Sequence, residues 1–232
     1  MLQINFQNIH KLKFDVNEAY KSLRTNILFC GSNIKTICIT SCLPEDGKSN
    51  VSFCLAMSLA ESGKKVVFVD ADLRRSVIIG RYKPDQSVIG LTHYLSGQNK
   101  IEEVLYETNI NNLDIIFSGP VPPNPAELLS SENFSDLIKI LQRVYDYVII
   151  DTPPISSVID SAIVAQNCDG VILVISAGTI SYKFAKKAIN QLEKTHSKIL
   201  GAVLNKYKYN NKYYGYEEKK YKKYLDLYSE NY

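Results

Sequence analysis

A glycine, a lysine and a serine stand together where a strand-like run of residues gives way to a helix-like run. Gly47, Lys48 and Ser49 follow the strand-like residues 35–40. Backbone N–H groups at the start of a helix point at an anion, and the helix dipole favours negative charge there. Gly47 lets the backbone approach a phosphate, Lys48 can bridge β- and γ-phosphates, and the hydroxyl of Ser49 can ligate Mg²⁺. The tripeptide therefore predicts the second half of a Walker A loop, with Cys42 in place of that pattern's first glycine.

Three aspartates follow two further strand-like runs. Residues 66–69 and 147–150 are continuous apolar runs, as expected of buried parallel strands, and Asp70, Asp72 and Asp151 come at or just after their ends. Because ligands bind outside the carboxyl ends of parallel strands, we expect these carboxylates at the same edge as the phosphate loop. Each aspartate alone could cap a helix, but together beside a triphosphate they would repel one another without a cation. Mg²⁺ prefers carboxylate and phosphate oxygens, so the group predicts a nucleotide site that contains Mg²⁺.

The end of the last predicted strand bears on which nucleotide is bound. Asn205 and Lys206 begin a stretch that resembles the N-K-x-D sequence of GTPases, whose aspartate pairs with guanine. Lys208 occupies the aspartate position and cannot accept those hydrogen bonds. The sequence therefore favours ATP.

The elements that must position these groups alternate along the chain. Strands are predicted at residues 35–40, 66–69, 113–117, 147–150, 171–175 and 199–204. Helices are predicted from the phosphate loop to residue 60 and near residues 15–30, 126–143, 159–166 and 182–194. This alternation predicts an α/β fold with a mostly parallel sheet and helices on both faces.

Composition limits the class of protein. Of the 232 residues, 45% are hydrophobic and 22% are charged, as in ordinary globular proteins, which excludes a wholly disordered, collagen-like or disulfide-scaffold chain. No apolar run approaches the roughly 20 residues that span a bilayer, and the first residues lack a signal-peptide pattern. We expect a cytoplasmic protein.

The last 27 residues differ sharply from the rest. Residues 206–232 hold seven lysines, four acids and nine of the sixteen tyrosines, whereas residues 1–205 carry equal numbers of basic and acidic residues. A stretch with so few aliphatic side chains cannot offset the entropy of ordering. We therefore predict a folded domain over residues 1–205 and a flexible tail over residues 206–232.

Taken together, these motifs resemble the bacterial tyrosine kinases (BY-kinases), specifically the stand-alone cytoplasmic kinases of capsule and exopolysaccharide loci. The family's motif S-x-x-P-G-E/D-G-K-S-T is similar to residues 41–50, its D-x-D-x-R motif to residues 70–74, and its third motif to residues 146–154. Residues 90–97 and 118–129 are also similar to the family. The resemblance implies a P-loop NTPase fold of the MinD-like deviant Walker type and ATP-dependent autophosphorylation of the tail.

The resemblance also implies roles for particular residues. Lys48 would hold the phosphates, Asp70 would be the base for the incoming tyrosine hydroxyl, and Lys48, Asp70 and Asp72 would form the catalytic group. Ser49, Asp72 and Asp151 would serve Mg²⁺. The nucleotide-binding residues would be Pro44, Glu45, Asp46, Gly47, Lys48, Ser49, Asn50 and Asn205. The autophosphorylated residues would be Tyr207, Tyr209, Tyr213, Tyr214, Tyr216, Tyr221, Tyr224, Tyr228 and Tyr232.

The expected partners follow from the same family. An E-x-x-R-x-x-R helix packs protomers of the family into a ring, so that one tail enters a neighbour's site. Glu18, Lys21 and Arg24 match it, with a lysine for one arginine, which loses a bidentate contact and implies a weaker homo-oligomer. The family further implies a membrane-embedded activator that recruits the kinase to the inner face of the membrane, and a phosphotyrosine phosphatase.

Two departures and two alternatives accompany this interpretation. Glu45 stands where the family has glycine, so a positive φ there would be strained and its carboxylate would repel the nucleotide. Asn50 replaces a threonine. The tail's lysines and tyrosines suit single-stranded nucleic acid, but its modest net charge and the neutral body disfavour that reading. The second alternative is a partition-type (MinD/ParA-like) ATPase switch. It would have a lysine where this chain has Leu43 and an amphipathic terminal helix, which the polar tail does not supply, so the sequence disfavours it.

Overall fold

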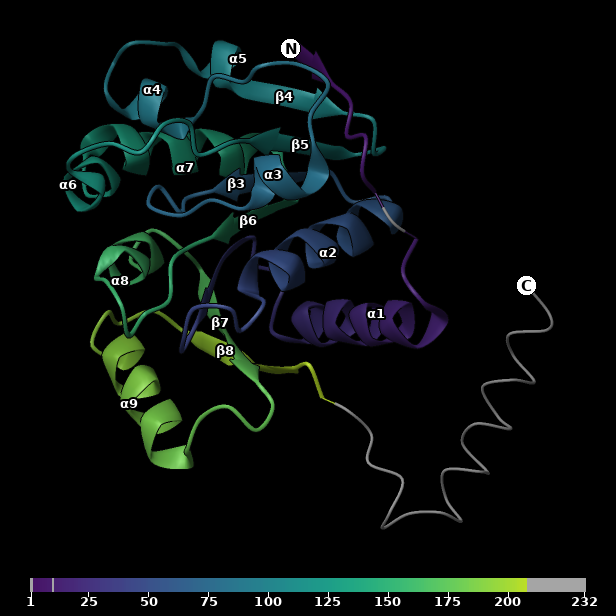
Figure 1. The fold of residues 1–232 in the computed structure, drawn as a ribbon, viewed down its shortest axis with the longest axis vertical. Coiled ribbons are helices and arrows are strands. Elements are labelled where there is room, and N and C mark those ends of the chain that lie inside the picture. The colour runs from purple at the N-terminus through teal and green to yellow at the C-terminus, as the bar shows by residue number, and fades with distance from the viewer. Residues whose placement is uncertain (1, 10, 208–232) are drawn as a thin grey trace.

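The strands form one mixed sheet whose centre is parallel. The computed structural model describes residues 2–9 and 11–207, and in this part of the chain eight strands are arranged in the order β1-β4-β5-β3-β6-β2-β7-β8 (Figure 1). Every neighbouring pair from β5 to β8 is parallel, and β4 runs antiparallel to β5 at one edge. The strands are β1 (Leu2–Ile4), β2 (Thr36–Ser41), β3 (Val66–Asp70), β4 (Leu105–Thr108), β5 (Leu113–Ile116), β6 (Tyr147–Asp151), β7 (Gly170–Ser176) and β8 (Ile199–Asn205).

Helices cover both faces of the sheet and create two apolar cores. The first core gathers side chains from α1, α2 and α3, and the second gathers side chains from α4 to α9. The helices are α1 (Phe14–Phe29), α2 (Lys48–Glu61), α3 (Ile78–Tyr82), α4 (Leu91–Leu95), α5 (Ile101–Val104), α6 (Pro125–Leu129), α7 (Glu132–Val144), α8 (Asp160–Ala165) and α9 (Tyr182–Glu193). In Figure 1, α1 lies beside α2, and α7 to α9 lie toward the other side. The predicted α/β architecture is confirmed.

The central strands read as continuous apolar runs because both of their faces are covered. Every residue of β2, β3 and β6 is buried. β3 and β6 pair in a register that sets Asp70 opposite Asp151, so two of the predicted aspartates end neighbouring strands at one edge. The helix after the phosphate loop ends where expected, because Gly63 adopts a left-handed φ of 82° just beyond the cap residue Ser62.

The structure corrects one predicted element and adds several. The single helix predicted near residues 126–143 is two helices, α6 and α7. Ser131 interrupts it because its hydroxyl accepts a hydrogen bond from the N–H of Phe134 and caps a new helix. Strands β1 and β4 and helices α3, α4 and α5 were not predicted, since each has only three to five residues and shows little periodicity.

The described part of the chain stops just after β8. Asn205 ends that strand, at the boundary predicted from composition, while residues 208–232 lie outside the described residues, and with them eight of the nine predicted acceptor tyrosines. The division into domain and tail stays a prediction. Across residues 2–9 and 11–207, no helix combines the length and the apolar character that crossing a membrane requires.

Candidate active site at the phosphate loop

The loop between β2 and α2 is braced by its own aspartate. The two carboxylate oxygens of Asp46 accept hydrogen bonds from the N–H groups of Leu43 at 2.8 Å and Ser176 at 3.3 Å. Gly47, the cap residue just before α2, has a φ of 88°, and a Cβ atom there would lie 2.2 Å from Nδ2 of Asn205. The positive φ favours glycine at this position, and a Cβ atom would also displace the amide group of Asn205. The carboxylate of Asp46, predicted to bind nucleotide, is occupied in shaping the loop.

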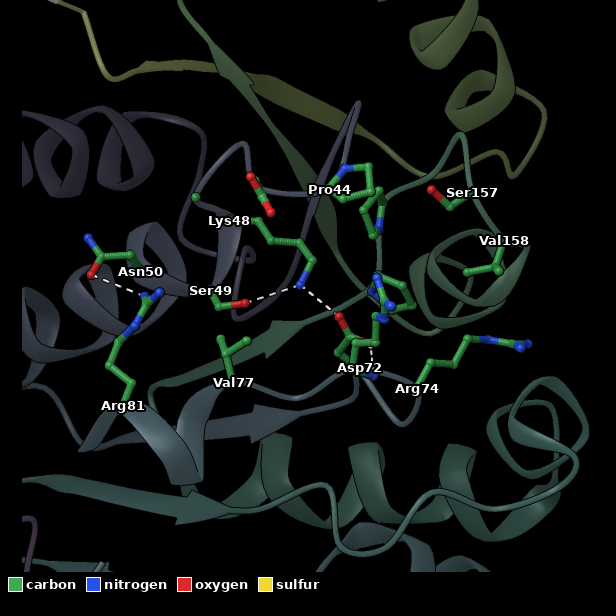
Figure 2. A pocket seen from close by; sticks show the side chains of 15 residues that line it. Pro44, Lys48, Ser49, Asn50, Asp72, Arg74, Val77, Arg81, Ser157 and Val158 are labelled. Carbon is green, nitrogen blue, oxygen red and sulfur yellow. Dashed lines mark hydrogen bonds and ion pairs between the residues drawn. The ribbon is translucent and has the colours of Figure 1, made fainter. Parts of the chain in front are cut away.

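Lys48 lies at the first turn of α2 with its ammonium group among oxygens. Its Nζ donates to Oδ2 of Asp72 at 2.8 Å and to Oγ of Ser49 at 3.1 Å (Figure 2). The same nitrogen lies 3.6 Å from Oδ2 of Asp151. Burial lowers the pKa of Lys48, but the charges of Asp151 and Asp72 outweigh it and raise that pKa above its ordinary value. The amine is a fixed positive charge at the helix N-terminus.

Asp70 and Asp151 form a buried layer behind this lysine. Asp70 is fully buried and accepts hydrogen bonds from the hydroxyl of Ser76 and from the N–H of Asp72. Burial, followed by the negative charge of Asp151, raises the pKa of Asp70 to about 7. Asp151 accepts a hydrogen bond from Ser52 at 3.1 Å through Oδ1, and burial raises its pKa as well.

The donor set fits Mg²⁺ held together with a nucleotide. Oδ2 of Asp151 is buried and has no hydrogen-bond partner in the described part of the chain. Like the oxygens of Asp72 and Ser49, it lies within 4 Å of Nζ of Lys48. Residues 2–9 and 11–207 contain no cluster of three acidic, histidine or cysteine side chains suited to hold a metal by themselves. Mg²⁺ is commonly bound by one or two carboxylates plus substrate phosphates and water, which these residues can supply.

A cavity of about 440 Å³ opens beside the loop, a volume in the range of small-molecule sites (Figure 2). The predicted residues that line it are Pro44, Glu45, Gly47, Lys48, Ser49, Asn50 and Asp72. Four other predicted residues do not line the cavity: Asp46, Asp70, Asp151 and Asn205.

The sequence motifs did not predict the rest of the lining. It contains three arginines, Arg74, Arg75 and Arg81, and residues of a turn that follows β6, namely Pro153, Pro154, Ser157 and Val158. Arg81 lies beside Asn50, whereas Arg74 lies apart from that pair (Figure 2). Arg74 is held in place by Asp160, whose two oxygens accept from Nε at 2.8 Å and Nη2 at 3.0 Å. Arg74, the arginine of the D-x-D-x-R motif, was the sequence signal for this part of the lining. The three arginines bring positive charge to the cavity.

Glu45 adopts the left-handed backbone conformation that is strained for residues with a Cβ atom. Its φ is 65°, and its side chain is exposed at the cavity. The end of the last strand and the residue after it contact this part of the loop. Nζ of Lys206 donates to the carbonyl oxygen of Glu45 at 2.6 Å, and Nδ2 of Asn205 donates to that of Asp46 at 2.8 Å. Asn205, predicted to bind nucleotide, thus contacts the loop itself.

The predicted oligomerisation residues lie on α1, away from the cavity. Glu18 and Lys21 form an exposed ion pair of 2.7 Å within the helix. Arg24 donates to the carbonyl oxygen of Ser58 at 2.6 Å and so fastens α1 to α2 of the same chain. Their role between protomers stays a prediction. Tyr207 is the one predicted acceptor among the described residues, and it is 60% exposed.

This fold and loop define a P-loop nucleotide-binding protein. Residues 34–207 match the family model described as an AAA domain. The septum site-determining protein MinD of Pyrococcus horikoshii, solved with Mg-ADP, superposes with a TM-score of 0.63 at 29% identity, over 75% of this chain and 70% of that one.

Closer relatives narrow the class. The tyrosine-protein kinase CpsD of Streptococcus agalactiae is 46% identical over 189 residues, which cover 82% of either chain. The kinase domain of the Escherichia coli tyrosine kinase ETK is 35% identical over 86% of this chain and 80% of that domain, with a TM-score of 0.79. The chain belongs to the bacterial tyrosine kinases and is a protein-tyrosine kinase, as its motifs predicted.

Proposed function

We propose that this kinase transfers the γ-phosphoryl group of ATP, bound with Mg²⁺, to the tyrosines of its own tail. The observation that carries the proposal is the ammonium group of Lys48, which lies at the N-terminus of α2, beside a cavity of about 440 Å³, with Asp72, Ser49 and Asp151 around it. These are the groups that phosphoryl transfer requires for positioning and charge neutralisation.

In this proposal the loop and α2 bind the phosphates. Backbone N–H groups of the loop point toward them, and Lys48 exchanges part of its contact with Asp72 for phosphate oxygens. Ser49, Asp72 and Asp151 hold Mg²⁺, which neutralises charge on the phosphates when it is bound. The arginines that line the cavity, Arg74, Arg75 and Arg81, help to orient the nucleotide.

Asp70 is the proposed acceptor of the tyrosine proton. Its pKa of about 7 allows a carboxylate to take up a proton near neutral pH. In the described structure the hydroxyl of Ser76 bonds one of its oxygens, so the incoming tyrosine must displace that hydroxyl.

The acceptors are Tyr207 and the eight tyrosines of residues 208–232, and transfer occurs in trans within a homo-oligomeric ring. A tethered acceptor has an effective concentration in the millimolar range for short flexible linkers. The resemblance to capsule and exopolysaccharide kinases adds three proposals: regulation of polysaccharide synthesis and export, recruitment to the inner face of the membrane by a membrane-embedded activator, and reversal by a phosphotyrosine phosphatase. No nucleic acid is part of the function.

A second candidate is an ATPase switch without tyrosine phosphorylation, and the likeness to MinD favours it. It would hydrolyse ATP and change its partners, while the tail stays unmodified.

Incubation of the full chain with labelled ATP and Mg²⁺ separates the two. We expect phosphotyrosine in the unmodified protein, none in Lys48→Met, and none in a full-length variant with all nine tail tyrosines changed to phenylalanine. Asp70→Asn should bind ATP but fail to transfer. Lys183→Met, an exposed lysine of α9 away from the cavity, is the control and should behave as the unmodified chain.

Intact-mass spectrometry counts the phosphates added per chain. Hydrolysis of ATP with no phosphotyrosine would support the switch. Phosphotyrosine that persists in Lys48→Met would contradict the proposed site.

A further inference from the structure

Asn205 and Lys206 form the root of the tail, and they donate hydrogen bonds to two consecutive carbonyl groups of the phosphate loop. Asn205 donates through Nδ2 to the carbonyl oxygen of Asp46 at 2.8 Å, and Lys206 donates through Nζ to that of Glu45 at 2.6 Å. The contacts join residues about 160 positions apart in the chain. The close fit at Gly47, where a Cβ atom would lie 2.2 Å from Nδ2 of Asn205, shows how tightly the two segments meet.

The backbone of Asn205 is held by the sheet. Asn205 pairs with Ser176 at the ends of β8 and β7, and its carbonyl oxygen accepts from the N–H of Ala177 at 2.8 Å. Ser176 in turn donates its N–H to the carboxylate of Asp46 in the loop. The loop and the ends of both strands therefore form one hydrogen-bonded unit.

Both residues joined by the lysine contact have left-handed backbones. Glu45 has a φ of 65° and Lys206 a φ of 56°, a conformation that residues with a Cβ atom adopt only at a free-energy cost. Such conformations persist where surrounding contacts fix them. The bond from Nζ of Lys206 is a contact of this kind, and it acts on Glu45.

The direction of these carbonyls fixes the direction of the neighbouring N–H groups. A trans peptide group is planar, so its C=O and N–H point opposite ways. When Lys206 and Asn205 draw the carbonyls of Glu45 and Asp46 toward β8, the N–H groups of Asp46 and Gly47 must point away from β8. Successive N–H groups aimed in one direction form an anion-binding concavity.

We propose that Lys206 is a positioning residue that aims the phosphate loop at the nucleotide, so that the root of the tail and the phosphate site act as one unit. The inference rests on the proposed binding of nucleotide phosphates at this loop. It assigns Lys206 a role through the backbone of Glu45 and not through contact with the nucleotide.

Titration calorimetry with the full chain, Mg²⁺ and a non-hydrolysable ATP analogue tests this role. Lys206→Met keeps the length of the side chain but loses the donor, and we expect it to raise the dissociation constant about fivefold, the value of one hydrogen bond. Lys206→Arg keeps a donor and should stay within about twofold of the unmodified chain. Lys183→Met is the matched control and should leave binding unchanged.

The same change in a Glu45→Gly background supplies a readout that a merely structural lysine would not move. Glycine adopts a left-handed φ freely, so Lys206→Met should there weaken binding less than about twofold. Without nucleotide, Lys206→Met should still unfold in one transition, with a urea midpoint only slightly below that of Lys183→Met because one exposed hydrogen bond is lost. Equal losses in both backgrounds, no loss in either, or a loss that arginine does not rescue and that follows a lower unfolding midpoint would each overturn the inference.

Failure of the two proposals gives different results. If the unmodified chain binds no analogue, the proposed nucleotide site itself fails. If the unmodified chain binds and Lys206→Met binds equally well, the nucleotide site stands and only the role of Lys206 is lost.

Discussion

Glu45 carries two separable effects at the mouth of the phosphate loop. Its positive φ of 65° is unfavourable for a residue with a Cβ atom, and its exposed carboxylate faces the cavity where phosphates are proposed to bind. The first effect acts on folding, while the second acts on nucleotide affinity. Substitutions can therefore distinguish them.

Glu45→Gln removes the charge and keeps the strain, whereas Glu45→Gly removes both. We expect both variants to bind Mg²⁺ and ATP about threefold more tightly, the size of an exposed charge interaction. Glu45→Gly alone should gain about 1 kcal/mol of unfolding free energy, because glycine is not strained at positive φ. Calorimetry and urea unfolding check the two effects. Equal stability of all three proteins would show that φ at residue 45 is not strained.

At the scale of elements, one ion pair ties the exit of β3 to the start of α8. Asp160 is fully buried at the first turn of α8, while the side chain of Arg74 is 39% exposed at the cavity wall. Two hydrogen bonds, of 2.8 and 3.0 Å, join them. Loss of the arginine would leave a buried carboxylate without its partner.

We expect Arg74→Met to lower the free energy of unfolding by about 2 kcal/mol, between the values of exposed and buried pairs. The double variant Arg74→Met/Asp160→Asn should recover part of this loss, since it removes the unpaired charge. Urea unfolding of the four proteins in the cycle measures both. Additive losses from the two substitutions would mean that the pair is not coupled.

A second link between elements is sensitive to pH. Asp114 on β5 is buried and accepts a 2.5 Å hydrogen bond from the hydroxyl of Tyr145, the residue just after α7. Burial raises the pKa of Asp114, although the bond from Tyr145 opposes the shift. The folded protein therefore keeps this proton at pH values where the unfolded chain has released it. Stability is lost as pH rises above the unfolded pKa of Asp114 and levels off above its folded pKa.

Asp114→Asn removes that dependence. We expect the unfolding free energy of the variant to increase relative to the unmodified chain between pH 4 and pH 7, in the absence of nucleotide and metal. Urea unfolding at each pH measures the difference. A constant difference across that range would show that Asp114 titrates alike in the folded and unfolded states.

At the scale of the whole molecule, the tail holds the excess charge. Residues 206–232 carry seven lysines and four acids, a net charge of +3, and each added phosphate contributes roughly −1.5 to −2. A few transfers would invert the sign. We therefore predict that phosphorylation loosens tail docking and contacts between protomers.

Light scattering before and after treatment with ATP and Mg²⁺ tests this prediction. The mean mass should fall in the unmodified chain and stay constant in the variant with nine phenylalanines, which cannot accept phosphate. An unchanged mass in a chain shown to be phosphorylated would count against the idea.

Much of this architecture could be predicted because the buried parallel strands are short apolar runs with acids at their ends. The strands that end in Asp70 and Asp151 are of this kind. In the structure they are neighbours in the sheet, with the two aspartates opposite each other. The break between α6 and α7 was not predicted. The polar residues 130–133 interrupt the apolar pattern there, but a serine in a polar run is recognised as a cap only once its hydroxyl is placed against the N–H of Phe134. The short strands β1 and β4, the first two strands at one side of the sheet, carry too few residues for a pattern.

The sequence by itself determined the chemistry: a glycine, an amine, a hydroxyl and three carboxylates whose spacing after strands places them at one sheet edge. Only the tertiary structure decided which of these side chains face the cavity and which lie buried behind it. Asp72 and Lys48 face the cavity, Asp70 lies buried behind them, and Lys206 reaches back to Glu45 from about 160 residues away. Local sequence sets the type and direction of each side chain, but contacts between distant segments exist only once the sheet has brought the ends of β2 and β8 together.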